Sequence, residues 1–275
     1  MNKEVSQVAY SAFSRYLIAN SGLVLGDAKQ YLVRSRLTPI MRQFDYDDIN
    51  NLLNDTVAGR NSRLSAACIE AMTTNETLWF RDQYPFHILT NLLLPNLAMK
   101  KASLRIWSCA CSTGQEPYSI AMTIAEFQQK HPQSFRNGVE ILATDISAEV
   151  LKHAEQATYD QLSLSRGLPS HMMSKYMQQI NEQEMMLKPG IRQLVKFRAL
   201  NLLDKFNDLG QFDIVFCRNV LIYFDTAHKT KVLQNISACL PQGGALMLGA
   251  SESLAGADKL FDLSIQPAGL YYVKT

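Results

Sequence analysis

The loop at residues 110–119 contains residue types that allow a ligand to approach a protein backbone. It reads ACSTGQEPYS and follows the apolar run 104–109. It has neither the GxxxxGK(S/T) lysine that binds phosphates nor the G-x-G-x-x-G fingerprint of dinucleotide sites. A nucleoside ligand without a pyrophosphate fits this pattern better, although an ordinary strand-to-helix turn would use the same residues.

Two further apolar runs end in polar residues that suit the same kind of ligand. Asp145 follows the run 139–144, where a carboxylate can bind both hydroxyls of a ribose. The alternative is that Asp145 or Ser147 only caps the next helix. Asn201 follows the run 194–200, where it could contact an adenine edge or simply form a turn.

Arg218 and Asn219 directly follow the apolar run 212–217. A charged side chain placed immediately after a buried strand is costly unless it has partners. The pair therefore indicates either a binding site or a structural arginine–carboxylate pair. Cysteines flank the same loops, but no histidine lies close to them in these segments to activate a thiol, so we expect no cysteine nucleophile.

The elements that must position these residues differ between the two parts of the chain. Up to residue 72, apolar residues recur at helical spacing and predict four helices and no strand. Asp27 is placed to cap the second helix, and Pro39 is expected to break or kink it. From residue 73, predicted strands at 104–109, 139–144, 212–217 and 245–249 alternate with predicted helices at about 116–130, 147–157 and 226–240.

This alternation is typical of an α/β domain with a mostly parallel sheet and helices on both faces. Ligands bind such sheets at the carboxyl ends of the strands, where the polar residues lie. The stretch 184–198 contains a Lys-Pro-Gly turn at 188–190 between two short runs. It predicts a hairpin inserted into the larger domain.

The composition excludes several classes of protein. With 47% apolar and 19% charged residues, the chain is neither disordered nor fibrous. A net charge of +2 gives no global reason to bind nucleic acid or an anionic membrane. No apolar run reaches the ~18 residues that span a bilayer, and no export signal is present. We therefore expect a soluble cytoplasmic protein, whose five cysteines are free thiols.

In this order, the motifs resemble the CheR family, the chemotaxis receptor methyltransferases that use S-adenosylmethionine. The matching segments are TTNETLWFRD (73–82), RIWSCACSTGQEPYSIAM (105–122), ATDIS (143–147), NLLD (201–204), FDIVFCRNVLIYFD (212–225) and GASESL (249–254). The resemblance implies a helical domain at 1–72 and a Rossmann-like methyltransferase domain at 73–275. It also implies an antiparallel β-subdomain inserted at about 178–198.

The resemblance further implies a site for S-adenosylmethionine, with S-adenosylhomocysteine as product and no metal. Arg81 would bind the carboxylate of the cofactor, Asp145 its ribose and Glu116 one of its donors. The same shell would include Asn75, Thr77, Asn201, Leu202, Arg218 and Asn219. Tyr223 would lie near the transferred methyl group, so Arg81 and Tyr223 are the expected catalytic residues.

The implied reaction is the formation of methyl esters on glutamate side chains of chemoreceptors. The segment 29–42 contains four basic residues and no acidic one. Through Arg34, Arg36 and Arg42 it would dock the acidic helical bundle of a receptor, although a solvated charged face is the usual fate of such residues. The short insert argues against a tether to the receptor's C-terminal peptide.

The expected enzyme is a monomer recruited to membrane receptor arrays, without insertion into the membrane or nucleic-acid binding. Gln115 departs from the family loop, which often reads STGEEPYS, and it keeps the size but loses the charge. Two other functions stay open. One is a methyltransferase of the same fold with another substrate, and the other is a regulatory module that binds the cofactor without turnover.

Overall fold

The computed structural model describes residues 4–26, 28–206 and 208–275. The chain divides into two compact units: Met1–Thr74 with Tyr223–His228, and Asn75–Ile222 with Lys229–Thr275. The segment that contains Tyr223 therefore groups with the N-terminal unit, although it lies within the second half of the sequence. Asp27, the expected helix cap, lies outside the described residues.

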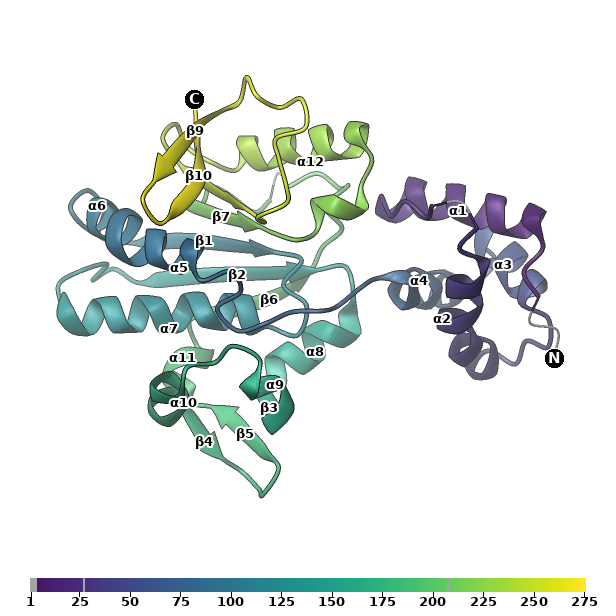
Figure 1. The fold of residues 1–275 in the computed structure, drawn as a ribbon, viewed down its shortest axis with the longest axis horizontal. Coiled ribbons are helices and arrows are strands. Elements are labelled where there is room, and N and C mark those ends of the chain that lie inside the picture. Colours follow the sequence, from purple (N-terminus) through teal and green to yellow (C-terminus); the bar gives the residue numbers. More distant parts are fainter. Residues whose placement is uncertain (1–3, 27, 207) are drawn as a thin grey trace. The chain divides into compact units, whose positions relative to one another are not determined.

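The described residues between 4 and 74 of the first unit contain four helices, as the sequence predicts. They are α1 (Gln7–Ser21), α2 (Gln30–Gln43), α3 (Ile49–Val57) and α4 (Ser62–Met72) (Figure 1). Side chains cap three of them, because Ser6, Asp48 and Asn61 accept hydrogen bonds from the first-turn amides of α1, α3 and α4. Gly22, with a φ of 72°, ends α1 in the left-handed conformation that suits glycine.

Pro39 does not break its helix, because α2 continues to Gln43, so that part of the expectation is wrong and the kink stays a prediction. A proline removes the amide that would bond the carbonyl four residues earlier, here that of Ser35. Pro39 and Ser35 are both exposed, so water can hydrate that carbonyl. The buried face of α2 carries Val33, Leu37 and Met41, and their packing holds the helix together.

The second unit contains a mixed sheet of seven strands within the described residues, in the order β6-β2-β1-β7-β8-β10-β9 (Figure 1). The strands are β1 (Leu104–Cys109), β2 (Val139–Asp145), β6 (Val195–Ala199), β7 (Ile214–Cys217), β8 (Ala245–Leu248), β9 (Phe261–Gln266) and β10 (Gly269–Lys274). The first five run parallel, and β10 pairs antiparallel with both of its neighbours, β8 and β9. The predicted Rossmann-like α/β fold is confirmed.

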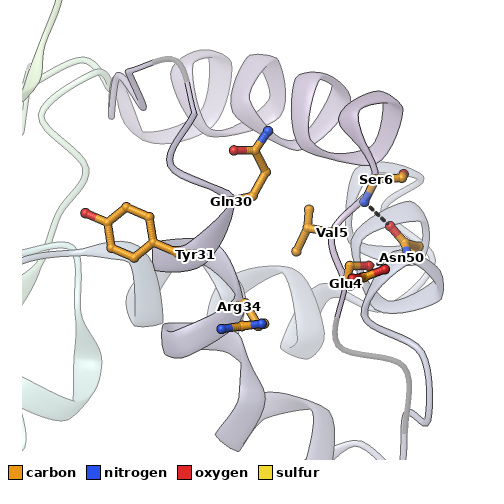
Figure 2. Close-up of a pocket in the computed structure, with 7 residues that line it drawn as sticks. All are labelled: Glu4, Val5, Ser6, Gln30, Tyr31, Arg34 and Asn50. Atoms are coloured by element: carbon orange, nitrogen blue, oxygen red, sulfur yellow. Dashed lines mark hydrogen bonds between the residues drawn. The ribbon is translucent and has the colours of Figure 1, made fainter.

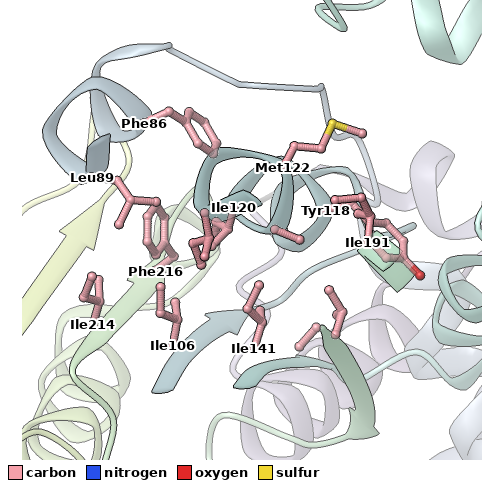
Figure 3. Close-up of a cluster of buried hydrophobic side chains, with 14 of the residues drawn as sticks. Phe86, Leu89, Ile106, Tyr118, Ile120, Met122, Ile141, Ile191, Ile214 and Phe216 are labelled. Carbon is pink, nitrogen blue, oxygen red and sulfur yellow. The ribbon is translucent and has the colours of Figure 1, made fainter. Parts of the chain in front are cut away.

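One face of this sheet is covered by helices on either side of β1 in the sequence. These are α5 (Tyr84–Ile88), its continuation through η1 (Leu89–Leu93) into α6 (Leu94–Ala98), and α7 (Gln115–Lys130). Figure 3 shows Phe86 and Ile120 of these helices above Ile106 and Ile214 of the sheet. Side chains alternate along a strand, so Val215 points to the other face. Two further helices between strands of this sheet are α8 (Ala148–Gln156) and α12 (Thr226–Ala238).

The predicted hairpin at 184–198 is wrong. Its first run is β5 (Glu184–Leu187), which pairs with β3 (Thr158–Asp160) and β4 (Met177–Gln179) in a separate antiparallel sheet. Its second run is β6, which joins the main sheet beside β2. The Lys-Pro-Gly segment starts the short helix α11 (Pro189–Arg192), because a proline suits the first turn of a helix. Two further short helices, α9 (Gln161–Ser165) and α10 (Ser170–Tyr176), lie between β3 and β4.

Candidate active site

The loops that carry the predicted site residues leave the sheet side by side. Cys109 at the end of β1 is in register with Thr144 of β2 on one side and with Cys217 of β7 on the other. The chain proceeds from β1 to one edge of the sheet and returns to β7, so the order of strands reverses between β1 and β7. A ligand site is expected at the carboxyl ends of strands at such a reversal.

We call the carboxyl ends of β1, β2 and β7, with the loops that follow them, the rim of the sheet. Arg218 lies at the centre of this rim, and its side chain is fully buried. Its Nη1 donates to Glu116 Oε2 at 2.9 Å, and its Nη2 donates to Asp82 Oδ2 at 2.6 Å. Nη2 also donates to the backbone oxygen of Arg81 at 3.0 Å. One guanidinium thus links the end of β7, the first turn of α7 and the segment 73–82. The structural arginine–carboxylate pair is present at the place where the sequence also indicates a site.

Glu116 is positioned from two further sides. Ser108 of β1 donates its hydroxyl to Glu116 Oε1 at 2.8 Å. Glu116 lies in the first turn of α7, where the helix dipole favours a negative charge. Its side chain is 13% exposed, so it is held close to the surface of the rim. An ionised carboxylate has about four acceptor sites, so these bonds leave Glu116 able to accept from a ligand.

Asp145 is a buried carboxylate at the end of β2. Its Oδ2 accepts from the amide of Ser112 at 2.8 Å, and its Oδ1 accepts from the amide of Ser147 at 3.0 Å. Ser147, and not Asp145, caps α8. Asp145 therefore fixes the backbone of the loop after β1, which the capping alternative does not account for.

The loops at the rim contain an unusual number of left-handed residues. Ala110 has a φ of 52°, Ser112 of 51° and Asn219 of 59°. Non-glycine residues rarely adopt this conformation, and such strain collects at functional sites. Gly114, with a φ of 94°, ends the loop after β1, and a Cβ there would lie 3.0 Å from the hydroxyl of Tyr159. The rim is thus a preformed backbone surface.

The segment 73–82 contacts the rim through its backbone. Ser112 donates its hydroxyl to the carbonyl of Asn75 at 2.7 Å. Arg81 is partly exposed, and its Nη1 donates to the carbonyl of Glu76 at 3.4 Å, which is a long bond that leaves the guanidinium able to bind a ligand. The side chain of Thr77 is also partly exposed. Asn75, Thr77 and Arg81 therefore lie on one segment that Arg218 and Ser112 hold in place.

The segment after β6 forms a turn whose first residue uses its side chain locally. Asn201 Oδ1 accepts from the amide of Leu203 at 3.0 Å, which is the turn that the sequence offers as an alternative to a contact with adenine. Leu202 is buried. The amide of Leu200 donates to the carbonyl of Asp145 at 2.9 Å, so this turn follows the strand next to β2 at the same end of the sheet.

Comparison with known proteins decides the family. A family model described as "CheR methyltransferase, SAM binding domain" matches residues 75–269. A second model, described as "CheR methyltransferase, all-alpha domain", matches residues 9–73. The chain belongs to the CheR methyltransferase family. It is therefore an S-adenosylmethionine-dependent methyltransferase of the chemotaxis type, and the predicted resemblance is confirmed.

Relatives within the CheR family match nearly the whole chain. The chemotaxis protein methyltransferase of Vibrio parahaemolyticus is 48% identical, with 98% of this chain and 97% of the relative covered. Chemotaxis protein methyltransferase 1 of Vibrio cholerae gives the same values. Among solved structures, a TehB-like SAM-dependent methyltransferase from Corynebacterium glutamicum covers 80% of this chain and 97% of its own, with 13% identity and a TM-score of 0.41.

The rim of this CheR family member fits the cofactor in two respects. The Nε atom of Arg218 is buried and has no hydrogen-bond partner in the described part of the chain. Such an orphaned donor is costly unless a ligand or water completes it. The carboxylates of Asp145 and Glu116 are the acceptors that hydroxyl and ammonium donors of S-adenosylmethionine require.

The expected docking residues of α2 have different surroundings. Arg34 is exposed and lines a cavity of about 510 Å³ within the helical unit, together with Tyr31 and Val5 (Figure 2). Arg42 is exposed in the last turn of α2. Arg36 is instead partly buried and donates to the carbonyls of Met72 and Thr73 and to Thr74 Oγ1, at 2.6, 2.8 and 3.0 Å. Arg36 therefore satisfies backbone carbonyls at the carboxyl end of α4.

Tyr223 groups with the helical unit in this structure. Its carbonyl accepts from the amide of Val24 at 3.0 Å, and the following residues include Asp225, which accepts from the amide of His228 at 2.9 Å. Hydrogen bonds from His228 lower the pKa of Asp225. The expected role of Tyr223 near the methyl group stays a prediction.

Two carboxylates at the rim escaped the sequence analysis. Asp82 pairs with Arg218, and Glu252 accepts from backbone amides at the ends of β7 and β8. Both lie inside the motifs TTNETLWFRD and GASESL that the sequence analysis identified. Membership of these motifs could have pointed to the two carboxylates, but the sequence does not show which groups they bind.

Burial disfavours the thiolate form of Cys109 and Cys111 at the rim. Burial raises the pKa of Cys109 well above its usual value, and the neighbouring Cys217 adds to this effect. Burial also raises the pKa of Cys111, with a further contribution from the charge of Asp145. Since the thiolate is the nucleophile, these shifts disfavour covalent catalysis by cysteine.

No helix in the described residues is long and apolar enough to cross a membrane. The same residues contain no cluster of three or more histidine, cysteine or acidic side chains that could hold a metal ion.

Proposed function

We propose that this chain transfers the methyl group of S-adenosylmethionine to glutamate side chains of chemoreceptors, which yields methyl esters and S-adenosylhomocysteine. The observation that carries the proposal is the buried Arg218 between Glu116 and Asp82, at the strand reversal where the family's motifs converge. The family and the names of its relatives supply the chemotaxis context.

The proposed cofactor shell assigns a role to each group of residues. Arg81 binds the carboxylate of the methionine part, since a guanidinium matches a carboxylate in a bidentate fork. Asp145 accepts from the ribose hydroxyls, and Glu116 accepts from one further donor. The remaining members of the proposed shell are Asn75, Thr77, Asn201, Leu202, Arg218 and Asn219.

Bound S-adenosylmethionine supplies a methyl group on a positively charged sulfonium. The acceptor is a glutamate carboxylate, which is ionised at neutral pH because its reference pKa is about 4.3. The enzyme therefore needs no general base. Its residues have to exclude water, because charge is lost in the transition state, and to hold the acceptor in line. We assign the second task to Tyr223 and the segment around it.

The helical unit is proposed to be the receptor-docking domain. Arg34 and Arg42 are exposed on α2, whose residues 30–43 include no acidic side chain. A basic helix can steer and orient an acidic helical bundle before methyl transfer. This docking also offers a way to recruit the enzyme to receptor arrays. Because Arg36 is engaged by the end of α4, we assign most of the docking to Arg34 and Arg42.

The decisive experiment incubates the protein with methyl-tritiated S-adenosylmethionine and receptor-containing membranes. Glutamate esters release volatile methanol in alkali, whereas methylated amines do not. Base-labile label on the receptor band supports the proposal. Label that is stable to alkali, or that appears on RNA or a small metabolite instead of the receptor, contradicts it. Cofactor binding without transfer to any acceptor would identify a regulatory module.

A further inference from the structure

Glu252 lies in the turn after β8, and its carboxylate accepts hydrogen bonds from backbone amides on two loops. Its Oε2 accepts from Asn219 and from Gly249, each at 2.7 Å. Its Oε1 accepts from Ile222 at 3.2 Å. Hydrogen bonds to an ionised acceptor are about twice as strong as neutral ones. One carboxylate therefore ties the carboxyl ends of β7 and β8 to the start of the short helix η2 (Leu221–Tyr223).

The lack of a side chain at position 249 makes this arrangement possible. A Cβ on Gly249 would lie 2.6 Å from Glu252 Oε2 and 2.9 Å from Asn219 Nδ2. Both contacts are shorter than real Cβ atoms show. Gly249, Glu252 and Asn219 thus form one packed unit, in which the glycine lets the carboxylate and the amide side chain approach the backbone.

The hydrogen bond to Glu252 bears directly on the backbone conformation of Asn219. Its φ of 59° is uncommon for a residue with a side chain, and the conformation persists only where the surroundings determine it. The hydrogen bond from the amide of Asn219 to Glu252 stabilises this conformation. The residue before it is Arg218, which holds Glu116 and the backbone of Arg81. A change in this turn would therefore displace several groups of the rim together.

We propose that Glu252 is a positioning residue of the cofactor site. It does not itself touch the reacting atoms. It fixes the backbone of Asn219, and through Ile222 the start of η2, in the conformation that binding requires. This inference rests on the proposed cofactor shell, but not on the identity of the methyl acceptor.

The test compares Glu252→Gln and Glu252→Ala with the control Asp262→Asn, which removes the same charge from an exposed position on β9. The glutamine keeps one oxygen for Asn219 and Gly249 but turns an NH₂ group towards the amide of Ile222. Titration calorimetry with S-adenosylhomocysteine should give affinities about tenfold weaker for the glutamine variant and weaker still for the alanine variant. The control should keep the parent's affinity.

A spectroscopic readout separates positioning from general stability. In the folded parent without ligand, the amide protons of Asn219 and Gly249 should resonate downfield, as expected for short bonds to a carboxylate, and should move upfield in the glutamine variant. A folded glutamine variant with affinity for S-adenosylhomocysteine within twofold of the parent overturns the inference, even if its melting temperature falls. If the alanine variant does not fold, the glutamine variant decides. Failure of receptor methylation in the parent would refute the proposed function and leave this binding test intact.

Discussion

Arg218 and Glu116 form a buried ion pair at the rim of the sheet, with 2.9 Å between Nη1 and Oε2. The side chain of Arg218 is 0% exposed, and its second terminal nitrogen bonds Asp82. A buried charge needs such partners, so the pair is a structural requirement of the rim. The same guanidinium holds the backbone of Arg81, so a structural pair and a ligand site coincide in one residue.

Substitution of Arg218 by Met should destabilise the protein strongly. Removal of one partner of a buried pair leaves the other charge uncompensated, which costs about 3–5 kcal/mol. Urea unfolding should show this loss, together with weaker binding of S-adenosylhomocysteine. The control is Arg198→Met, since Arg198 pairs with Asp208 on the surface and should leave the unfolding midpoint unchanged. Equal midpoints for the two variants would contradict the burial argument.

Substitution of Arg81 by Ala should have the opposite profile. Arg81 makes one long bond to the carbonyl of Glu76 and is partly exposed, so stability should change little. If it binds the carboxylate of the cofactor, binding of S-adenosylhomocysteine should weaken by about 1.5–3 kcal/mol, the scale for hydrogen bonds to charged groups. Titration calorimetry measures this directly, with the exposed Arg136→Ala as control. Unchanged affinity would remove Arg81 from the cofactor site.

The sequence predicted individual helices and strands better than it predicted which strands pair with one another. The strand β1 matched its predicted bounds, and α1 to α4 are the four helices predicted up to residue 72, because apolar periodicity is a local signal. The hairpin at 184–198 failed because β6 pairs in parallel with β2, more than fifty residues earlier, and no local pattern reports such a pairing. The break predicted at Pro39 did not occur, because the carbonyl that this proline leaves without a donor is on the exposed side of α2.

At the site, residue type indicated function but not partnership. From the sequence, Arg218 could belong to a binding site or to a structural arginine–carboxylate pair. Only the fold shows that Asp82 and Glu116 approach it from other elements. Arg36 illustrates the same limit from the other direction. Its place in a basic helix predicted docking, while its guanidinium bonds the carbonyls at the end of α4. A charge pattern cannot reveal which of its members have a partner within the protein.

Charge reversal on α2 should slow receptor methylation without affecting the cofactor. The double variant Arg34→Glu/Arg42→Glu repels an acidic bundle, so the rate should fall most at low salt, where screening is weakest. Cofactor affinity measured by calorimetry should stay at the parent's value. Arg36→Glu is a useful contrast, because it should lower the melting temperature of the helical unit as well. Equal methylation rates for the double variant and the parent at all salt concentrations would exclude docking through α2.

The stability of the helical unit should decline in alkali because of Cys68. Burial raises the pKa of this thiol from 9.0 to about 11. A group whose pKa is raised on folding contributes stability that is fully present below the unfolded pKa and is lost as pH rises through the folded pKa. The loss should therefore develop between about pH 9 and pH 11 and reach at most ~3 kcal/mol. Urea unfolding of the parent and of Cys68→Ala at pH 8 and pH 11 isolates this contribution, since other raised groups are common to both. The alanine variant should lose less stability than the parent between the two pH values, and equal losses would show that ionisation of Cys68 is not coupled to folding.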